Sequence, residues 1–151
     1  MSHKVSIEHR ASLPLAVLRR RVLQHQLSRV VPEGCGRVWT VLKQHGVTGA
    51  GRHVAVYLNG AIDLEVGVEI SNTFTGAAEV VRSQTPAGMV AAVRHLGPYQ
   101  ELHLAHQAVR QFCADHGHRL AGPSWEIYGH WEAAWDHDPS QVRTDVVYLL
   151  E

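Results

Sequence analysis

Apolar and polar residues alternate along several stretches of the chain, which is the period of a half-buried β-strand. Between Leu64 and Ile70, for example, every second residue is a large aliphatic one. The run 15–23 mixes apolar and basic residues and also fits a helical stripe, so a helix is the alternative there. The strands that the pattern predicts lie at about residues 5–7, 15–23, 53–58, 64–70, 80–83, 89–95, 124–129 and 143–150.

Two segments instead carry apolar residues at intervals of three and four, which predicts amphipathic helices. In the first, near residues 31–46, Pro32 stands where a first-turn proline would stand and Gly46 supplies the C-terminal stop. The second, near residues 98–117, is bounded by a proline and a glycine in the same way.

The order of these elements in the second half repeats that of the first: strand, helix, two strands. Residues 51–57 align with residues 122–128 at a constant offset of 71. Two βαββ units paired edge to edge predict an α+β fold with pseudo-two-fold symmetry, in which both helices cover one face of an antiparallel sheet. A ligand would then bind in a cleft between the repeats or on the other face. We expect a single domain, 1–151, with halves of about 1–75 and 76–151.

Composition restricts the class of protein. Hydrophobic residues make up 45% and charged residues 19%, which are values of a folded globular chain. Fourteen basic and fourteen acidic residues balance, so the charge favours neither nucleic acid nor a membrane surface as a partner. No apolar run approaches the roughly 18 residues of a spanning helix. The two cysteines, Cys35 and Cys113, are typical of reduced core thiols, and we expect a cytoplasmic protein without a signal peptide.

One carboxylate stands out within a predicted strand. Ser124, Glu126 and Tyr128 share one face of that strand, while the opposite face carries Trp125 and Ile127. A buried carboxylate without a partner is costly, so Glu126 either lies at a solvated edge, has a structural partner, or meets its partner only when a cationic ligand binds. In the last case burial would raise its pKa.

Aromatic residues gather near this carboxylate, since three of the four tryptophans fall between residues 125 and 135. Aromatic faces together with one carboxylate suit a flat, cationic ligand. Core packing is the alternative for Trp39 and Trp125. The residues that we expect to bind the ligand are Glu126, Tyr57, Tyr128, Trp39, Trp131 and Trp135.

The histidines invite a metal interpretation, which the spacing does not favour. His103 and His106 are three residues apart, and a second group of His, Asp and Glu falls between residues 130 and 137. Neither has the convergent pattern of a zinc site, so we predict no metal and no cofactor. The basic run 19–21 is typical of a solvated face.

The segments 93–99, 122–128 and 143–150 together resemble the GyrI-like small-molecule-binding domain, which also forms the effector-binding part of multidrug-responsive transcription regulators. The resemblance covers nearly all of the chain. It implies a tandem βαββ fold with a ligand cleft between the repeats, and a glutamate at the Glu126 position that meets the positive charge of lipophilic cations. The chain has no room for a helix-turn-helix or a coiled-coil linker, so we expect a freestanding member without direct nucleic-acid binding.

Three functions are open at this point. The first is binding of a hydrophobic, often cationic small molecule, for sequestration or sensing of xenobiotics. The second, which the resemblance suggests, is hydrolysis of cyclopropane-containing DNA-alkylating natural products, with Glu126 as acid or base if the residue is catalytic. The third is a protein module that interacts with DNA gyrase.

Overall fold

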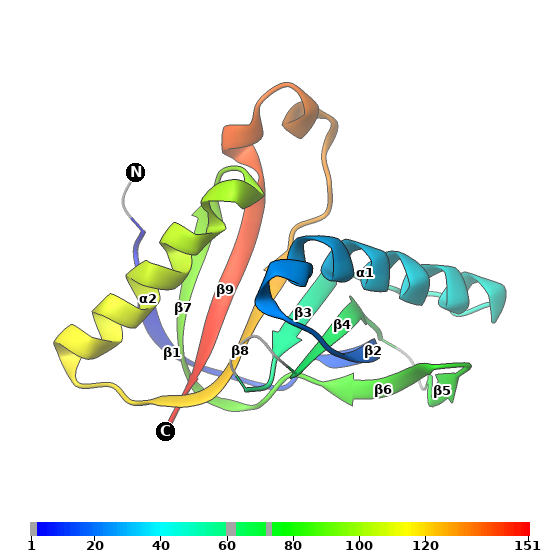
Figure 1. Cartoon of the computed structure of the whole chain (residues 1–151), viewed down its shortest axis with the longest axis horizontal. Coiled ribbons are helices and arrows are strands. Elements are labelled where there is room, and N and C mark those ends of the chain that lie inside the picture. The colour runs from blue at the N-terminus through cyan, green and yellow to red at the C-terminus, as the bar shows by residue number, and fades with distance from the viewer. Residues whose placement is uncertain (1–2, 60–62, 72–73) are drawn as a thin grey trace.

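A single antiparallel sheet of nine strands, with two α-helices on one of its faces, makes up the part of the chain that the computed structural model describes, residues 3–59, 63–71 and 74–151 (Figure 1). The α+β fold predicted from the sequence is confirmed. The helices are α1 (Leu27–Gln44) and α2 (Leu102–His116). The strands are β1 (Ser6–Arg10), β2 (Pro14–Arg21), β3 (His53–Tyr57), β4 (Asp63–Glu69), β5 (Gly76–Ala77), β6 (Val80–Gln84), β7 (Gly88–Leu96), β8 (Leu120–Tyr128) and β9 (Arg143–Leu150).

The strand order follows the repeat in the sequence. The sheet runs β1-β7-β9-β8-β3-β4-β2-β6-β5, so the units β2-α1-β3-β4 and β7-α2-β8-β9 place corresponding strands at corresponding positions. The two units join along β3 and β8, where Ala55 pairs with Glu126. These are the residues that the offset of 71 aligns, so a two-fold axis relating the repeats would pass between them. That the two βαββ halves superpose on each other through this axis stays a prediction.

Helix α1 begins about one turn earlier than the sequence predicted, and Pro32 lies inside it. The apolar stripe explains this difference, because Leu27 and Val31 continue the four-residue spacing that leads to Cys35. Burying Val31 contributes about 1.5–3 kcal/mol and partly burying Leu27 adds to it, which offsets much of the roughly 3 kcal/mol that an internal proline costs. The predicted stop is confirmed, since Gly46 follows the helix with a φ of +66°.

The helix-bearing face of the sheet has two apolar clusters, one under each helix. Helix α1 lies so close to β4 that a methyl group on Gly34 would collide with the side chain of Val66. Helix α2 packs through Ala105, Val109 and Cys113 on β7 and β9. Both cysteines are free and buried, as predicted.

The opposite face of the sheet is filled by a third apolar cluster. Leu15 of β2 and Val90 of β7 belong to this cluster with Trp125 and Ile127, although four strands separate β2 from β7 in the sheet order. Leu15 and Val90 are also fully buried, although the helices lie on the other face. The sheet is therefore bent so that its two wings, the strands around β2 and those around β7, cover this face. Because this face is closed by its own side chains, the expectation that it could be open to a ligand was wrong.

The segment between β8 and β9 forms two short 3-10 helices, Ala133–Asp136 and Pro139–Gln141, at one end of the sheet (Figure 1). In the described residues, no helix is both long and apolar enough to span a bilayer.

Candidate functional site

A cavity of about 1090 Å³ opens between α1 and α2, with β3 and β8 as its floor. The two βαββ units each contribute one helix and one floor strand, so the cavity lies between the repeats, where the sequence predicted a cleft. Its wall on α1 is mainly apolar and carries Leu27, Val31, Cys35 and Trp39 at intervals of four residues. The wall on α2 is basic.

Glu126 lies at the floor of this cavity, where its side chain is 7% exposed. The hydroxyl of Tyr57 donates to its Oε1 at 2.8 Å, and the hydroxyl of Tyr128 donates to the same oxygen at 2.6 Å. Tyr57 comes from the first repeat and Tyr128 from the equivalent position of the second. The two repeats therefore hold one carboxylate between them.

His106 completes the partners of the carboxylate. Its Nε2 lies 2.6 Å from Oε2 of Glu126, and its Nδ1 lies 2.6 Å from the hydroxyl of Tyr148. Nη1 of Arg110 donates to the same hydroxyl at 2.9 Å. Because a guanidinium can only donate, the Tyr148 oxygen accepts there and its hydrogen is available to Nδ1, which leaves the proton on Nε2 for Glu126. A chain of hydrogen bonds thus runs from Arg110 to Glu126.

These contacts decide the ionisation of the site. Burial raises the pKa of Glu126, but the hydrogen bond from His106 and the electrostatic interaction with its ring, with the bonds from Tyr128 and Tyr57, lower it by more, so that it lies below its ordinary value. The expectation of a carboxylate that lacks a partner and has a raised pKa was wrong. Glu126 is therefore ionised at neutral pH.

The other titratable groups of the floor stay protonated. Burial and the nearby charge of Glu126 raise the pKa of Tyr57 and of Tyr128 above the ordinary value of 10.0, so both hydroxyls keep their hydrogen. Burial raises the pKa of the Cys35 thiol to about 12, which makes it a poor nucleophile at neutral pH. The floor of the cavity thus presents one negative charge, next to the neutral hydroxyls of two tyrosines.

The structure brings together part of the set that the sequence predicted. Glu126, Tyr57, Tyr128 and Trp39 all line the cavity. Trp39 is about one-third exposed, with its ring 5.9 Å from that of His53.

The remaining tryptophans do not line the cavity. Trp135 belongs to the loop between β8 and β9 and is buried, and Trp131 stands edge-on to it, with 54% of its surface exposed. Trp131 donates from its indole to Asp136 at 3.0 Å, so this pair stabilises the loop itself. Trp125 lies in the cluster on the opposite face, as the core interpretation had it.

Sequence reasoning missed the residues on the α2 side. His106 falls on the same helical stripe as Leu102, Ala105 and Val109, and a polar residue on a buried stripe was the available signal. Tyr148 and Arg110 gave no comparable signal, because strand β9 and helix α2 meet only in the fold. Among the described residues, no three His, Cys, Asp or Glu side chains converge as metal ligands would.

Comparison with known proteins gives one family and a set of similar folds. A family model described as the GyrI-like small molecule binding domain matches residues 3–148. No curated protein sequence matches the chain.

Three solved structures illustrate the likeness. The C-terminal domain of EcmrR is 18% identical, with a TM-score of 0.76 over 100% of this chain and 99% of that one. A hydrolase encoded by lin2189 from Listeria innocua is 10% identical, with a TM-score of 0.63 over 98% and 92%. SAV2435 bound to tetraphenylphosphonium is 11% identical, with a TM-score of 0.61 over 100% and 94%. At these identities the likeness shows the fold alone.

Proposed function

Because the chain belongs to the family of GyrI-like small molecule binding domains, we propose that its cavity between α1 and α2 binds a hydrophobic aromatic molecule that carries a positive charge. The observation that carries this proposal is the ionised carboxylate of Glu126 at the floor of a cavity with an apolar wall. Its role would be sequestration or sensing of such molecules.

The charge of Glu126 is available to a ligand in spite of its three donors. The hydroxyls of Tyr57 and Tyr128 are neutral, and neither neutralises the carboxylate. A carboxylate has about four acceptor positions, and Oε2 uses one of its two for His106. A cation in the cavity would therefore meet both a negative charge and an unused acceptor position, with the Trp39 ring on the facing helix.

The relatives support the same ligand chemistry. SAV2435, which shares the fold, binds tetraphenylphosphonium, an aromatic cation without hydrogen-bond donors. Such a ligand is held by charge and by ring contacts, which are worth about 0.5–2 kcal/mol per aromatic ring. Both kinds of group line the cavity here.

The experiment is a calorimetric titration of the protein and of Glu126→Gln with tetraphenylphosphonium and with the neutral triphenylphosphine oxide. Glu126→Gln removes the electrostatic attraction between the carboxylate and the cation, so the variant should bind the cation at least about tenfold more weakly, which corresponds to about 1.4 kcal/mol. Its affinity for the neutral compound should change by less than about threefold. Equal loss for both compounds would mean that Glu126 only shapes the cavity, and failure of the unaltered protein to bind either compound would refute the proposal.

A hydrolase is the second candidate, and the short contact between His106 and Glu126 favours it. In that reaction the oxygen of water would bond to one carbon of a strained three-membered ring as the carbon–carbon bond breaks. Glu126 would take a proton from the water and pass it to the other ring carbon, which keeps the electron pair of the broken bond. A carboxylate with a lowered pKa is a weak base, which is why we rank binding first. Mass spectrometry of a cyclopropane-containing alkylating agent after incubation separates the two, because only a hydrolase adds one water.

A further inference from the structure

Two formally charged side chains line the cavity within the described part of the chain, and they have opposite signs. One is Glu126 on the floor strand β8. The other is Arg110 on α2, three hydrogen bonds away through Tyr148 and His106. A ligand that carries only a positive charge would satisfy the first and be repelled by the second.

Most N–H donors of the Arg110 guanidinium have no partner among the described residues. It is exposed, and its described contact is the single hydrogen bond from Nη1 to the hydroxyl of Tyr148. No carboxylate of the described residues lies within 4.0 Å of its guanidinium. A guanidinium has five N–H donors in a planar fork that fits both oxygens of a carboxylate, so four of them remain.

The surroundings of Arg110 favour an anion as well. His103 and His106 line the same α2 wall as Arg110, together with the apolar Leu102, so among the described residues that wall carries no acidic side chain. The facing wall on α1 is uncharged. Among the described residues that line the cavity, the carboxylate that could repel a negative group beside Arg110 is that of Glu126. Its oxygens accept hydrogen bonds from Tyr57, Tyr128 and His106.

We propose that Arg110 forms a carboxylate-binding subsite, and that the ligand is an amphoteric aromatic molecule whose cationic part lies toward Glu126 and whose carboxylate pairs with Arg110. This inference rests on the proposed function. It narrows the ligand class, because binding of such a molecule neutralises both charges of the cavity at once and leaves no like charges facing each other.

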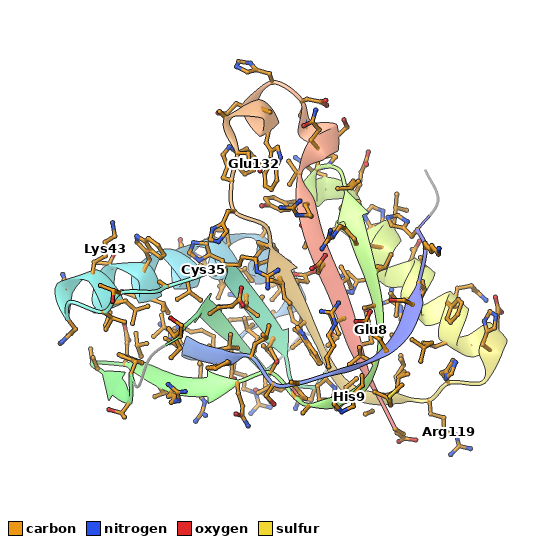
Figure 2. All side chains as sticks on the ribbon, turned by 180° about the vertical axis from the view of Figure 1, so that it is seen from behind. Glu8, His9, Cys35, Lys43, Arg119 and Glu132 are labelled. Carbon is orange, nitrogen blue, oxygen red and sulfur yellow. The ribbon has the colours of Figure 1, made fainter. Side chains whose placement is uncertain are left out.

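Rhodamine B and its methyl ester test the inference. The two dyes share one cationic ring system, and esterification removes only the carboxylate. Fluorescence anisotropy would measure the affinity of each dye for the unaltered protein, for Arg110→Gln and for Arg119→Gln. Arg119 is the control, because it is exposed, lies between the end of α2 and the start of β8 (Figure 2), and does not line the cavity.

Arg110→Gln should weaken rhodamine B at least tenfold and leave the methyl ester within about twofold or slightly tighter. Arg119→Gln should change neither dye. Tyr148→Phe removes the hydroxyl but keeps Arg110, so it should not reproduce the selective loss. Equal weakening of both dyes by Arg110→Gln, or no weakening of rhodamine B, would overturn the subsite while leaving the proposed function intact. If neither dye binds the unaltered protein, the proposed function and the subsite fail together.

Discussion

Glu126 and Ala55 face each other across the ladder between β8 and β3, at the positions that the repeat makes equivalent. Both are buried on the face that carries the helices. One of them has a carboxylate and the other a methyl group, so the cavity between two similar units has a single charge at its centre. Two carboxylates at this distance could not both ionise. The asymmetry is what allows tyrosines from both repeats to donate to the same oxygen.

Tyr57→Phe and Tyr128→Phe should each lower the free energy of unfolding by about 1.5–3 kcal/mol, because each removes one hydrogen bond to a buried charge. Tyr99→Phe is the matched control, since Tyr99 also lines the cavity, is 46% exposed and touches Tyr128 only through its ring. It should stay within about 0.5 kcal/mol. Urea denaturation measures all three, and a loss in the control as large as in the others would contradict the role of the hydroxyls.

The loss of folding stability at acidic pH should depend on Glu126. Its folded pKa lies below the ordinary 4.5, so the unfolded chain takes up this proton first as the pH falls. The stability that the carboxylate contributes is therefore present above about pH 4.5 and is lost as the pH falls through the folded pKa. Glu126→Gln should lose roughly 1–3 kcal/mol at pH 7, because its amide meets the donor of His106, and the difference should shrink in acid.

Denaturation of both proteins between pH 3 and pH 7 checks this, with Glu132→Gln as the control at an exposed loop position (Figure 2). A difference between Glu126→Gln and the unaltered protein that stays constant across this range would mean that the residue contributes no proton linkage.

The fold could be predicted from the sequence because its signals are local. Alternation, helical spacing and the 71-residue offset each depend on neighbours along the chain, and the strand order agrees with them. The start of α1 was predicted wrongly, because Pro32 was interpreted as a first-turn proline. Packing on the sheet extends the apolar stripe of the helix back to Leu27. The partners of Glu126 could not be predicted in the same way, since His106 reaches it from another element and Tyr57 from the other repeat. The closed second face likewise depends on the bend of the sheet.

Trp125 and Trp131 lie six residues apart and should respond differently to truncation. Trp125 is 1% exposed and packs between the wings of the sheet, so Trp125→Ala should cost about 3–5 kcal/mol. Trp131 is 54% exposed and outside the cavity lining, so Trp131→Ala should cost about 1 kcal/mol or less. Thermal unfolding measures both. Neither change should alter ligand affinity in the folded protein, and a tenfold loss of affinity in Trp131→Ala would show that the ligand extends onto the loop.

The last prediction concerns what keeps the pKa of Glu126 low. Burial opposes ionisation, and His106 supplies the largest of the contributions that favour it. In His106→Leu the burial stays and this contribution is gone, so the pKa of Glu126 should rise. His103→Leu is the matched control, because His103 lines the same wall of the cavity but bonds to the carbonyl of Gln100. It should leave that pKa unchanged.

Carbon-13 NMR of the glutamate carboxyl groups follows the titration directly, and Glu126→Gln identifies the signal. If His106→Leu and His103→Leu give the same titration as the unaltered protein, the two tyrosines alone keep the carboxylate ionised. A rise in His106→Leu only would show that one histidine from the second helix sets the charge in the cavity. That variant would then bind tetraphenylphosphonium more weakly near the raised pKa and normally well above it, since only the ionised carboxylate attracts the cation.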